Sequence, residues 1–148
     1  MRVVPAGHAH LHHWARMRNA LWPEEGVAGH RDEARAMLEV GGGQVAFVAL
    51  DLADRPIGFV EAVLRHDYVN GCDSSPVAFV EGLYVEPAHR GEAVARALVA
   101  AVEQWGGGQG CTELASDADI TNLASHAFYR AIGFEETERV VYFRKRIG

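Results

Sequence analysis

Cysteine is scarce in this sequence, which has only Cys72 and Cys111 among its 148 residues. Small secreted domains that depend on disulfides carry several patterned cysteines, and a structural zinc site needs four protein ligands. Two unpatterned cysteines support neither arrangement, and a chain of this length can bury a hydrophobic core without crosslinks. We therefore predict reduced thiols and a cytoplasmic protein.

Long apolar runs are also missing. The apolar run at the N-terminus is interrupted by Pro5, so this stretch lacks the continuous apolar centre of a signal peptide. No later stretch approaches the ~20 apolar residues that cross a bilayer. The sequence therefore predicts no membrane association.

The sequence has no excess of positive charge. It contains 14 lysines and arginines against 20 acidic residues, a formal net charge of -6. Proteins that bind the phosphate backbone of nucleic acids carry a basic field, so we expect no nucleic-acid partner. A negative field favours cationic ligands instead. An anionic cofactor would have to be held by local backbone N–H groups and a few basic side chains.

Hydrophobic periodicity predicts helices and strands in a definite order. Apolar residues at spacings of three and four predict helices over residues 8–21, 30–40, 94–105 and 122–133. Segments rich in Val, Phe and Ile predict strands over residues 44–51, 57–68, 77–86, 111–118 and 140–147. The turn-forming sequence ADRP separates the first two strands, as in an antiparallel hairpin. We predict one α/β (α+β) domain over residues 1–148, with a mixed, mostly antiparallel sheet and helices on both faces.

Residues 81–105 are the most informative segment, because an apolar strand is followed by a short basic turn and an amphipathic helix. The N–H groups at a helix N-terminus are unpaired, and the helix dipole adds positive potential there. Such a turn can bind phosphate. His89 and Arg90 add side-chain donors, and the small residues that follow would let a pyrophosphate approach the main chain closely.

The turn resembles the pyrophosphate signature of the GNAT acetyltransferase superfamily. The matching residues are Arg90, Gly91, Glu92, Ala93, Val94 and Ala95. The resemblance implies that this loop holds the pyrophosphate of acetyl-CoA, the cosubstrate. It also implies that the strand residues Leu83, Tyr84 and Val85 bind the pantetheine arm through their backbone. Ala93 stands where the family usually has glycine, which would loosen binding if the position requires a positive φ.

Residues 116–136 resemble the C-terminal GNAT signature, in which an Asn opens a helix and a Tyr precedes a Gly-Phe pair. By this resemblance Asn122 hydrogen-bonds the CoA arm. Tyr129 lies near the sulfur and is the acid for the departing thiolate. The order of the predicted elements also follows the GNAT fold along nearly the whole chain.

Several stretches resemble one subgroup of GNAT enzymes, the aminoglycoside 6′-N-acetyltransferases. These stretches are NALW, HDYVNGCDSSPVAFVEGLYVEPAHR, CTELASDA and ETERVVYF. The resemblance implies that Trp22 and Tyr68 line the sugar-binding cleft, that Glu81 and Asp117 contact the ammonium groups, and that Glu138 adds a further acidic contact. It also implies a homodimer. An aromatic wall with carboxylates suits a ligand that combines apolar ring faces with cationic amines.

Carboxylates are frequent at the predicted strand ends, where an acceptor cleft would open. They are Asp67, Asp73, Glu81, Glu86, Asp117, Asp119, Glu136 and Glu138. A protonated amine cannot attack a thioester, so one carboxylate must accept its proton, and Glu81 is the first candidate and Asp117 the second. The resemblance to the GNAT family also implies that the sheet splays at Leu83 to Val85, which leaves a backbone N–H unpaired to stabilise the oxyanion. No covalent enzyme intermediate is expected, because neither cysteine has a base partner in the sequence.

Two other readings stay open at the level of the sequence. A GNAT enzyme that acetylates a polyamine, a small amine or a protein N-terminus would also use an acidic cleft. A non-catalytic acyl-CoA-binding module is favoured by Ala93 but not by the intact Asn122 and Tyr129. The histidines of HAHLHH have spacings that could place pairs on helix faces, yet no third ligand can be named, so we expect no metal.

Overall fold

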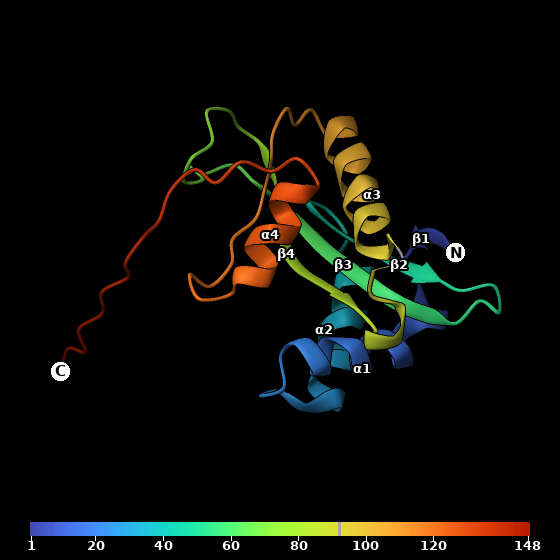
Figure 1. Ribbon diagram of the computed structural model, residues 1–148. Helices are drawn as coiled ribbons and strands as arrows, with labels where there is room; N and C mark the ends of the chain where they lie inside the picture. Colours follow the sequence, from blue (N-terminus) through green and yellow to red (C-terminus); the bar gives the residue numbers. More distant parts are fainter. Residues whose placement is uncertain (92) are drawn as a thin grey trace.

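The computed structural model describes residues 1–91 and 93–148, which form a mixed sheet with helices on both sides (Figure 1). The strands are β1 (Arg2–Pro5), β2 (Gln44–Leu50), β3 (Pro56–Arg65), β4 (Val77–Val85) and β5 (Leu114–Ala115). They lie side by side in chain order. The neighbours from β1 to β4 are antiparallel, whereas β5 runs parallel to β4. The predicted mixed, mostly antiparallel sheet is confirmed.

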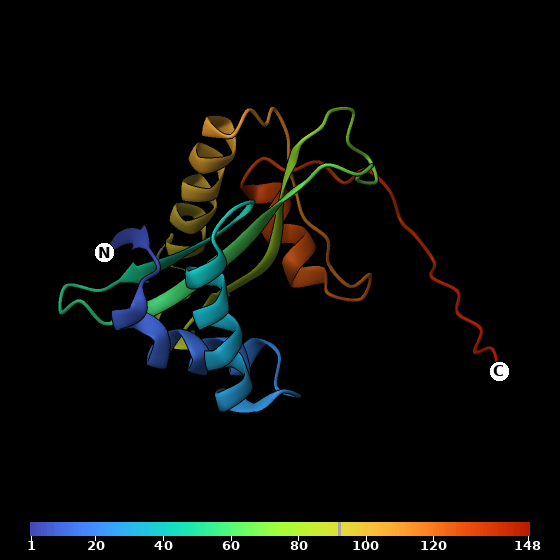
Figure 2. The same cartoon turned by 180° about the vertical axis from the view of Figure 1, so that it is seen from behind.

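Helices α1 (Leu11–Leu21) and α2 (Gly26–Val40) cover one face of the sheet, and a short 3-10 turn, η1 (His8–His10), precedes them. Figure 2 shows this pair in front of the strands, with the other helices behind. Trp14, Met17 and Ala34 of this layer are buried against Val48 and Phe59. The apolar spacing along α1 therefore faces the sheet, as its period requires.

Helix α3 (Val94–Gly108) covers the opposite face and follows a 3-10 turn, η2 (Pro87–His89). Its buried stripe of Val94, Leu98 and Val102 packs on Ile57 and Val60 of β3. Helix α4 (Leu123–Ala131) lies on the same side, beside β4 (Figures 1 and 2). The sheet thus separates two apolar cores, one under each helical layer.

The β2–β3 hairpin forms as its turn sequence predicts. The Asp51 carboxylate accepts hydrogen bonds from the backbone N–H groups of Ala53, at 2.8 Å, and of Arg55, at 2.9 Å. Asp54 adopts a φ of +61°, a conformation that Asp tolerates better than most residues. A local carboxylate-to-backbone turn therefore sets the hairpin, independent of the rest of the fold.

Two sheet edges differ from the prediction. Strand β1 was not expected, because four residues ending in proline give little periodic signal; it is formed by pairing with β2, from Arg2 opposite Leu50 to Pro5 opposite Phe47. The strand predicted over residues 111–118 is reduced to the two residues of β5, which pair with Ala78 and Phe79. Edge strands depend on a neighbour more than on their own sequence.

The closing strand predicted over residues 140–147 is wrong for the single chain. This segment has no strand conformation and extends away from the body of the molecule (Figure 1). Its apolar side chains are exposed, with Tyr142 at 84% and Phe143 at 93%. A strand needs a hydrogen-bonded neighbour, and within the described residues this segment has none.

Residues 1–91 and 93–148 include no helix with the length and apolar character that a membrane crossing would require.

Candidate active site

The loop that joins β4 to α3 has the geometry of an anion site. The Nε of Arg90 donates to the Val85 carbonyl at 2.9 Å, and its guanidinium lies 5.6 Å from the centre of the Tyr84 ring. Gly91 has a φ of +84°, and a Cβ there would meet no atom within 4 Å, so the space above the loop is open. Glu92, also predicted to take part, lies outside the described residues. Ala93 is the N-cap of α3 and its side chain makes no capping hydrogen bond.

An opening of about 400 Å³ lies between this loop and α4. Its lining residues are Val85, His89, Arg90, Gly91, Ala93, Val94, Ala95, Arg96, Phe128, Ala131 and Ile132. Two arginines and an uncapped helix N-terminus supply positive potential, and none of the lining residues that the structure describes is a carboxylate, which fits a pyrophosphate. The residues of the predicted cofactor loop that the structure describes are therefore brought together around a space suited to acetyl-CoA.

Ala93 adopts the left-handed conformation, with φ +64° and ψ 15°. This conformation costs a non-glycine residue roughly 1–2 kcal/mol. We predict that Ala93→Gly stabilises the protein by about 0.5–1 kcal/mol, because the strain removed exceeds the added entropy of the unfolded chain. Ala100→Gly, on the exposed face of α3, should instead destabilise by about 1 kcal/mol. Urea unfolding of both variants checks the signs; destabilisation by Ala93→Gly would contradict the strain.

On the other side of the sheet, a second opening of about 510 Å³ forms an acidic cleft. Its lining residues are Arg18, Trp22, Glu24, Glu25, His30, Glu33, Met37, Gln44, Glu61, Val63 and Glu81. Of the residues predicted to bind the acceptor, Trp22 and Glu81 meet here. An aromatic wall with several carboxylates suits a ligand that carries more than one ammonium group.

Glu81 is presented by an irregularity of β4. Glu61 pairs with Gly82 and Ala62 pairs with Val80, so Glu81 is an extra residue between two ladder pairs. Such a bulge re-aims a side chain, and Glu81 is exposed where its neighbours are buried. Gly82 is required beside it, because a Cβ there would lie 2.4 Å from Cη2 of Trp22. The bulge and the glycine together place a carboxylate next to the indole.

The outer edge of β4 is open beyond the bulge. Strand β5 pairs only with Ala78 and Phe79, so among the described residues no strand covers Leu83, Tyr84 and Val85 on that side. This is the splayed sheet that the resemblance implies. The free edge lies between the cofactor loop and Glu81 along the same strand. It can offer backbone donors and acceptors to an extended ligand.

Tyr129 projects from α4 toward this edge. Its Oη lies 2.9 Å from Oγ of Ser116, which also lies 3.2 Å from the Val80 carbonyl and can donate to it. Burial raises the pKa of Tyr129, Asp117 raises it further, and the Ser116 hydrogen bond opposes them. The phenol therefore stays protonated and able to donate. Asn122 caps α4 by accepting from the Ser125 N–H at 3.1 Å.

The remaining predicted residues lie outside the lining of the acidic cleft. The Tyr68 hydroxyl contacts Glu138 at 3.4 Å, and both residues are exposed. Asp117 follows β5 and is also exposed. Its charge and that of Glu81 reach Arg65, whose pKa is raised first by its hydrogen bond to Asp67.

Not every carboxylate at a strand end is free for a ligand. Asp67 pairs with Arg65, and Glu136 pairs with Arg130 at 2.7 Å and Arg139 at 2.5 Å, which lower its pKa to about 2. Asp119 is hydrogen-bonded to Thr121. Three of the eight predicted carboxylates are therefore already engaged by partners within the chain and are less available to a cationic ligand.

The sequence analysis missed four acidic residues of this cleft, which are Glu24, Glu25 and Glu33 from the first helical layer and its connecting loop, and Glu61 from β3. The Glu24–Glu25 pair two residues after Trp22 is the signal that could have located them. Glu61 stands alone in an apolar strand, and a buried acid within such a run points to a partner elsewhere.

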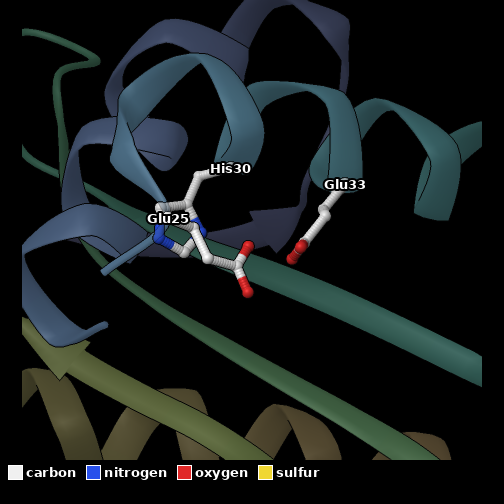
Figure 3. A group of neighbouring side chains, drawn as sticks. All are labelled: Glu25, His30 and Glu33. Carbon is white, nitrogen blue, oxygen red and sulfur yellow. The ribbon is translucent and has the colours of Figure 1, made fainter. Parts of the chain in front are cut away.

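Glu25, His30 and Glu33 lie close enough to suggest a metal site, since their ligand atoms are all within 4.8 Å of one another (Figure 3). The ring of His30 does not fit this role. Its Nδ1 accepts from Arg18 at 3.2 Å and its Nε2 lies 2.7 Å from the Trp22 carbonyl, so both nitrogens are engaged. Glu33 is moreover paired with Arg18, and its hydrogen bond to Glu25 raises the pKa of Glu25. These side chains are thus engaged with Arg18, with the Trp22 carbonyl and with one another, which does not suit a metal site.

Comparison with known proteins assigns the chain to a family. The model of the acetyltransferase (GNAT) family matches residues 14–134. The chain belongs to this family. The first signature found in the sequence, at the turn before α3, lies within the matched residues, and so does the second, over residues 116–136, except for its last two residues.

Particular relatives match along almost the whole chain. "Aminoglycoside N(6')-acetyltransferase type 1" of Serratia marcescens is 47% identical over 146 residues, which cover 99% of each chain. The protein of the same name from Stenotrophomonas maltophilia is 50% identical over 131 residues, 88% of this chain and 84% of the relative.

Solved structures agree with these matches. AAC(6')-Iy in complex with the bisubstrate analogue CoA-S-monomethyl-acetylneamine has a TM-score of 0.92 at 43% identity, over 99% of this chain and 98% of the other. The apo aminoglycoside 6'-N-acetyltransferase AAC(6')-IG of Acinetobacter haemolyticus has a TM-score of 0.91 at 42% identity, with all of both chains covered.

Proposed function

We propose that this protein transfers the acetyl group of acetyl-CoA to the 6′-amine of an aminoglycoside and thereby confers resistance to the antibiotic. The observation that carries the proposal is the acidic cleft, in which Glu81 lies at the β4 bulge beside the indole of Trp22. The full-length relatives named for this reaction support it. The cofactor loop follows one end of the open β4 edge and Glu81 lies at the other, so an extended cofactor arm along this edge would carry its acetyl group toward the acceptor.

In this proposal the predicted cofactor residues bind acetyl-CoA along the loop and the open β4 edge. Arg90, Gly91 and the first turn of α3 bind the pyrophosphate, and the backbone from Leu83 to Val85 binds the pantetheine arm and stabilises the oxyanion. Acetyl-CoA, when bound, supplies the activated acetyl group.

The reaction also needs two proton transfers, one from the attacking ammonium and one to the departing sulfur. Glu81 accepts the proton of the attacking ammonium, with Asp117 as the second candidate. Tyr129 donates a proton at the site of the departing sulfur. Burial raises the pKa of the thiols of Cys72 and Cys111, which disfavours the thiolates that an acyl-cysteine intermediate needs.

We also propose that the chain forms a homodimer in the cytoplasm. The support is the C-terminal segment, whose exposed apolar side chains have no cover within the single chain. They are Val140, Val141, Tyr142, Phe143 and Ile147. A second copy could supply the missing strand neighbour and bury these side chains.

Truncation after Arg139 tests the assembly. We expect the full chain to have the mass of a dimer by light scattering and the truncated chain that of a monomer. Both proteins should be compared at the same concentration, because a weak dimer dissociates on dilution. A monomeric full chain would contradict the dimer.

A thiol-release assay tests the reaction. Kanamycin and tobramycin should release CoA from acetyl-CoA, whereas an aminoglycoside with a 6′-hydroxyl should not, because the nucleophilic amine is absent. Added salt should raise KM for kanamycin, since attraction between a polycation and carboxylates is screened over about 10 Å at 0.1 M. Spermidine and a peptide panel serve as competing acceptors. Turnover of spermidine without any aminoglycoside would favour polyamine acetylation, and equal turnover of the 6′-hydroxyl compound would contradict the regiochemistry.

A further inference from the structure

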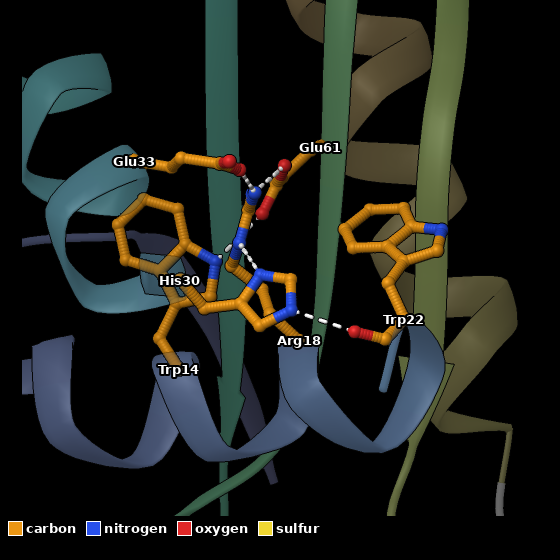
Figure 4. A network of polar contacts seen from close by, with 6 residues as sticks. All are labelled: Trp14, Arg18, Trp22, His30, Glu33 and Glu61. Atoms are coloured by element: carbon orange, nitrogen blue, oxygen red, sulfur yellow. Dashed lines mark hydrogen bonds and ion pairs between the residues drawn. The ribbon is translucent and has the colours of Figure 1, made fainter. Parts of the chain in front are cut away.

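A buried polar network lies beneath the acidic cleft, between the first helical layer and the sheet (Figure 4). Arg18 and Glu61 are each 5% exposed and His30 is 1% exposed. Arg18 donates to His30 through Nε at 3.2 Å, to Glu61 through Nη1 and to Glu33 through Nη2. Trp14 donates from its indole to the second oxygen of Glu61 at 2.9 Å. Every nitrogen of the Arg18 guanidinium thus has its own acceptor.

A network of this kind is a poor source of stability. Moving a guanidinium and a carboxylate out of water costs several kcal/mol per ion, and replacement of a buried ion pair by apolar residues is often neutral or stabilising. Burial raises the pKa of Glu61, while the Arg18 charge and the Trp14 hydrogen bond favour its ionised form. The well-attested use of such groups is to specify one geometry among several.

The geometry that this network specifies is that of Trp22. The Nε2 of His30 donates to the Trp22 carbonyl at 2.7 Å, since a carbonyl can only accept, and the two rings stack with centres 6.2 Å apart. The Arg18 guanidinium lies 5.1 Å from the centre of the Trp22 ring. The Arg18 carbonyl also accepts from the Trp22 N–H at 2.7 Å. Both the backbone and the ring of Trp22 are therefore held by the same two residues.

Trp22 needs this support because α1 ends there. It is the C-cap residue, with φ −128° and ψ 80°, so its carbonyl has left the helical ladder and takes the bond from His30. On its other side the indole rests on Gly82, next to Glu81. A shift of Trp22 would change the distance between the aromatic wall and the carboxylate that receives the amine.

We propose that Arg18 and His30 are positioning residues that hold Trp22 as a rigid wall of the acceptor cleft, with Glu61 as their anchor on the sheet. The proposal rests on the proposed function, because it assigns Trp22 to acceptor binding. Since α3, which begins at the cofactor loop, packs on the opposite face of the sheet, we expect the network to affect acceptor recognition more than acetyl-CoA binding.

The test compares two replacements of His30. His30→Phe keeps a ring against Trp22 but loses both hydrogen bonds, and we expect KM for kanamycin to rise about tenfold, with kcat and the calorimetric Kd for acetyl-CoA within twofold of wild type. His30→Gln can donate to the Trp22 carbonyl and accept from Arg18, so it should restore KM to within threefold. Val102→Ala, which opens the core under α3, is the control for general loss of stability and should leave KM unchanged.

A double-mutant comparison tests whether His30 acts through Trp22. In a Trp22→Ala background, His30→Phe should cause no further rise in KM, because the positioned ring is gone. Arg18→Lys keeps the charge beside Glu61 but loses the bond to His30 and the contact of the guanidinium with the Trp22 ring, and should raise KM even if His30→Phe fails to fold.

The outcomes separate the two claims. Absence of kanamycin turnover by the wild-type protein overturns the proposed function. Turnover with an unchanged KM in His30→Phe or, if that variant is unfolded, in Arg18→Lys overturns the positioning role alone. The positioning role is also overturned if KM for kanamycin rises as much in Val102→Ala, or if His30→Phe loses acetyl-CoA affinity by the same factor. It is overturned as well if His30→Phe raises KM as much in the Trp22→Ala background as in the wild type.

Discussion

Glu81→Gln should lower kcat/KM for kanamycin by about 10² or more, the usual scale for a lost general base. The substitution keeps the size of the side chain at the β4 bulge and removes both the base and a counter-charge for the acceptor. Because Glu81 is exposed and makes no ladder pair, the fold should tolerate the change. Steady-state kinetics with kanamycin, with acetyl-CoA saturating, gives the result directly.

Two matched variants identify the cause. Glu103→Gln, on the exposed face of α3, removes one carboxylate of the same type away from the cleft and should leave kcat/KM unchanged. Asp117→Asn should mainly raise KM if that residue only binds an ammonium group. If Asp117→Asn instead abolishes turnover while Glu81→Gln retains it, the base is Asp117 and the order of the two candidates is reversed.

Tyr129→Phe should lower kcat by about 10², at the lower end of the range for a lost general acid, with acetyl-CoA affinity changed much less. The ring remains packed between Phe128 and Phe134, so only the hydroxyl and its contact with Ser116 are lost. Loss of one such hydrogen bond costs about 1 kcal/mol of stability, which leaves the protein folded. Single-turnover kinetics separates the chemical step from product release, and calorimetry gives the affinity.

The pH profile gives a second measurement for Tyr129. Burial raises the pKa of its hydroxyl above the ordinary value of 10, and the nearby Asp117 acts in the same direction. The acid form is therefore complete at neutral pH, and the loss of kcat that comes from its deprotonation should have its midpoint above pH 10. Tyr142→Phe, on the exposed C-terminal segment, should leave kcat at the wild-type value. Wild-type kcat in Tyr129→Phe, with chemistry rate-limiting, would remove this residue from the mechanism.

Local sequence was sufficient where the interactions are local. The hairpin turn at Asp51 and the start of α3 after Arg90 are built from residues within a few positions of one another. The apolar period of α1 and α3 likewise predicts which face each helix buries. Trp22 and Glu81 were named from a resemblance in sequence, and the structure brings them into one cleft.

Only the tertiary structure decided the features that depend on a distant partner. Strand β1 exists because β2 pairs with it, and residues 140–147 are not a strand because no neighbour among the residues that the structure describes pairs with them. The bulge that exposes Glu81 is a matter of register between β3 and β4, which no single segment encodes.

The acidic cleft shows the same division most clearly. Glu61 reads in sequence as an isolated charge in an apolar strand, and Arg18 as one of several arginines on a helix. The fold buries the two against each other and engages His30 between Arg18 and the Trp22 carbonyl. A chain's own sequence determines which groups it carries and which faces it buries. Because desolvation makes an unpaired buried charge costly, buried charges are paired, and only packing in three dimensions determines which residues form the pairs.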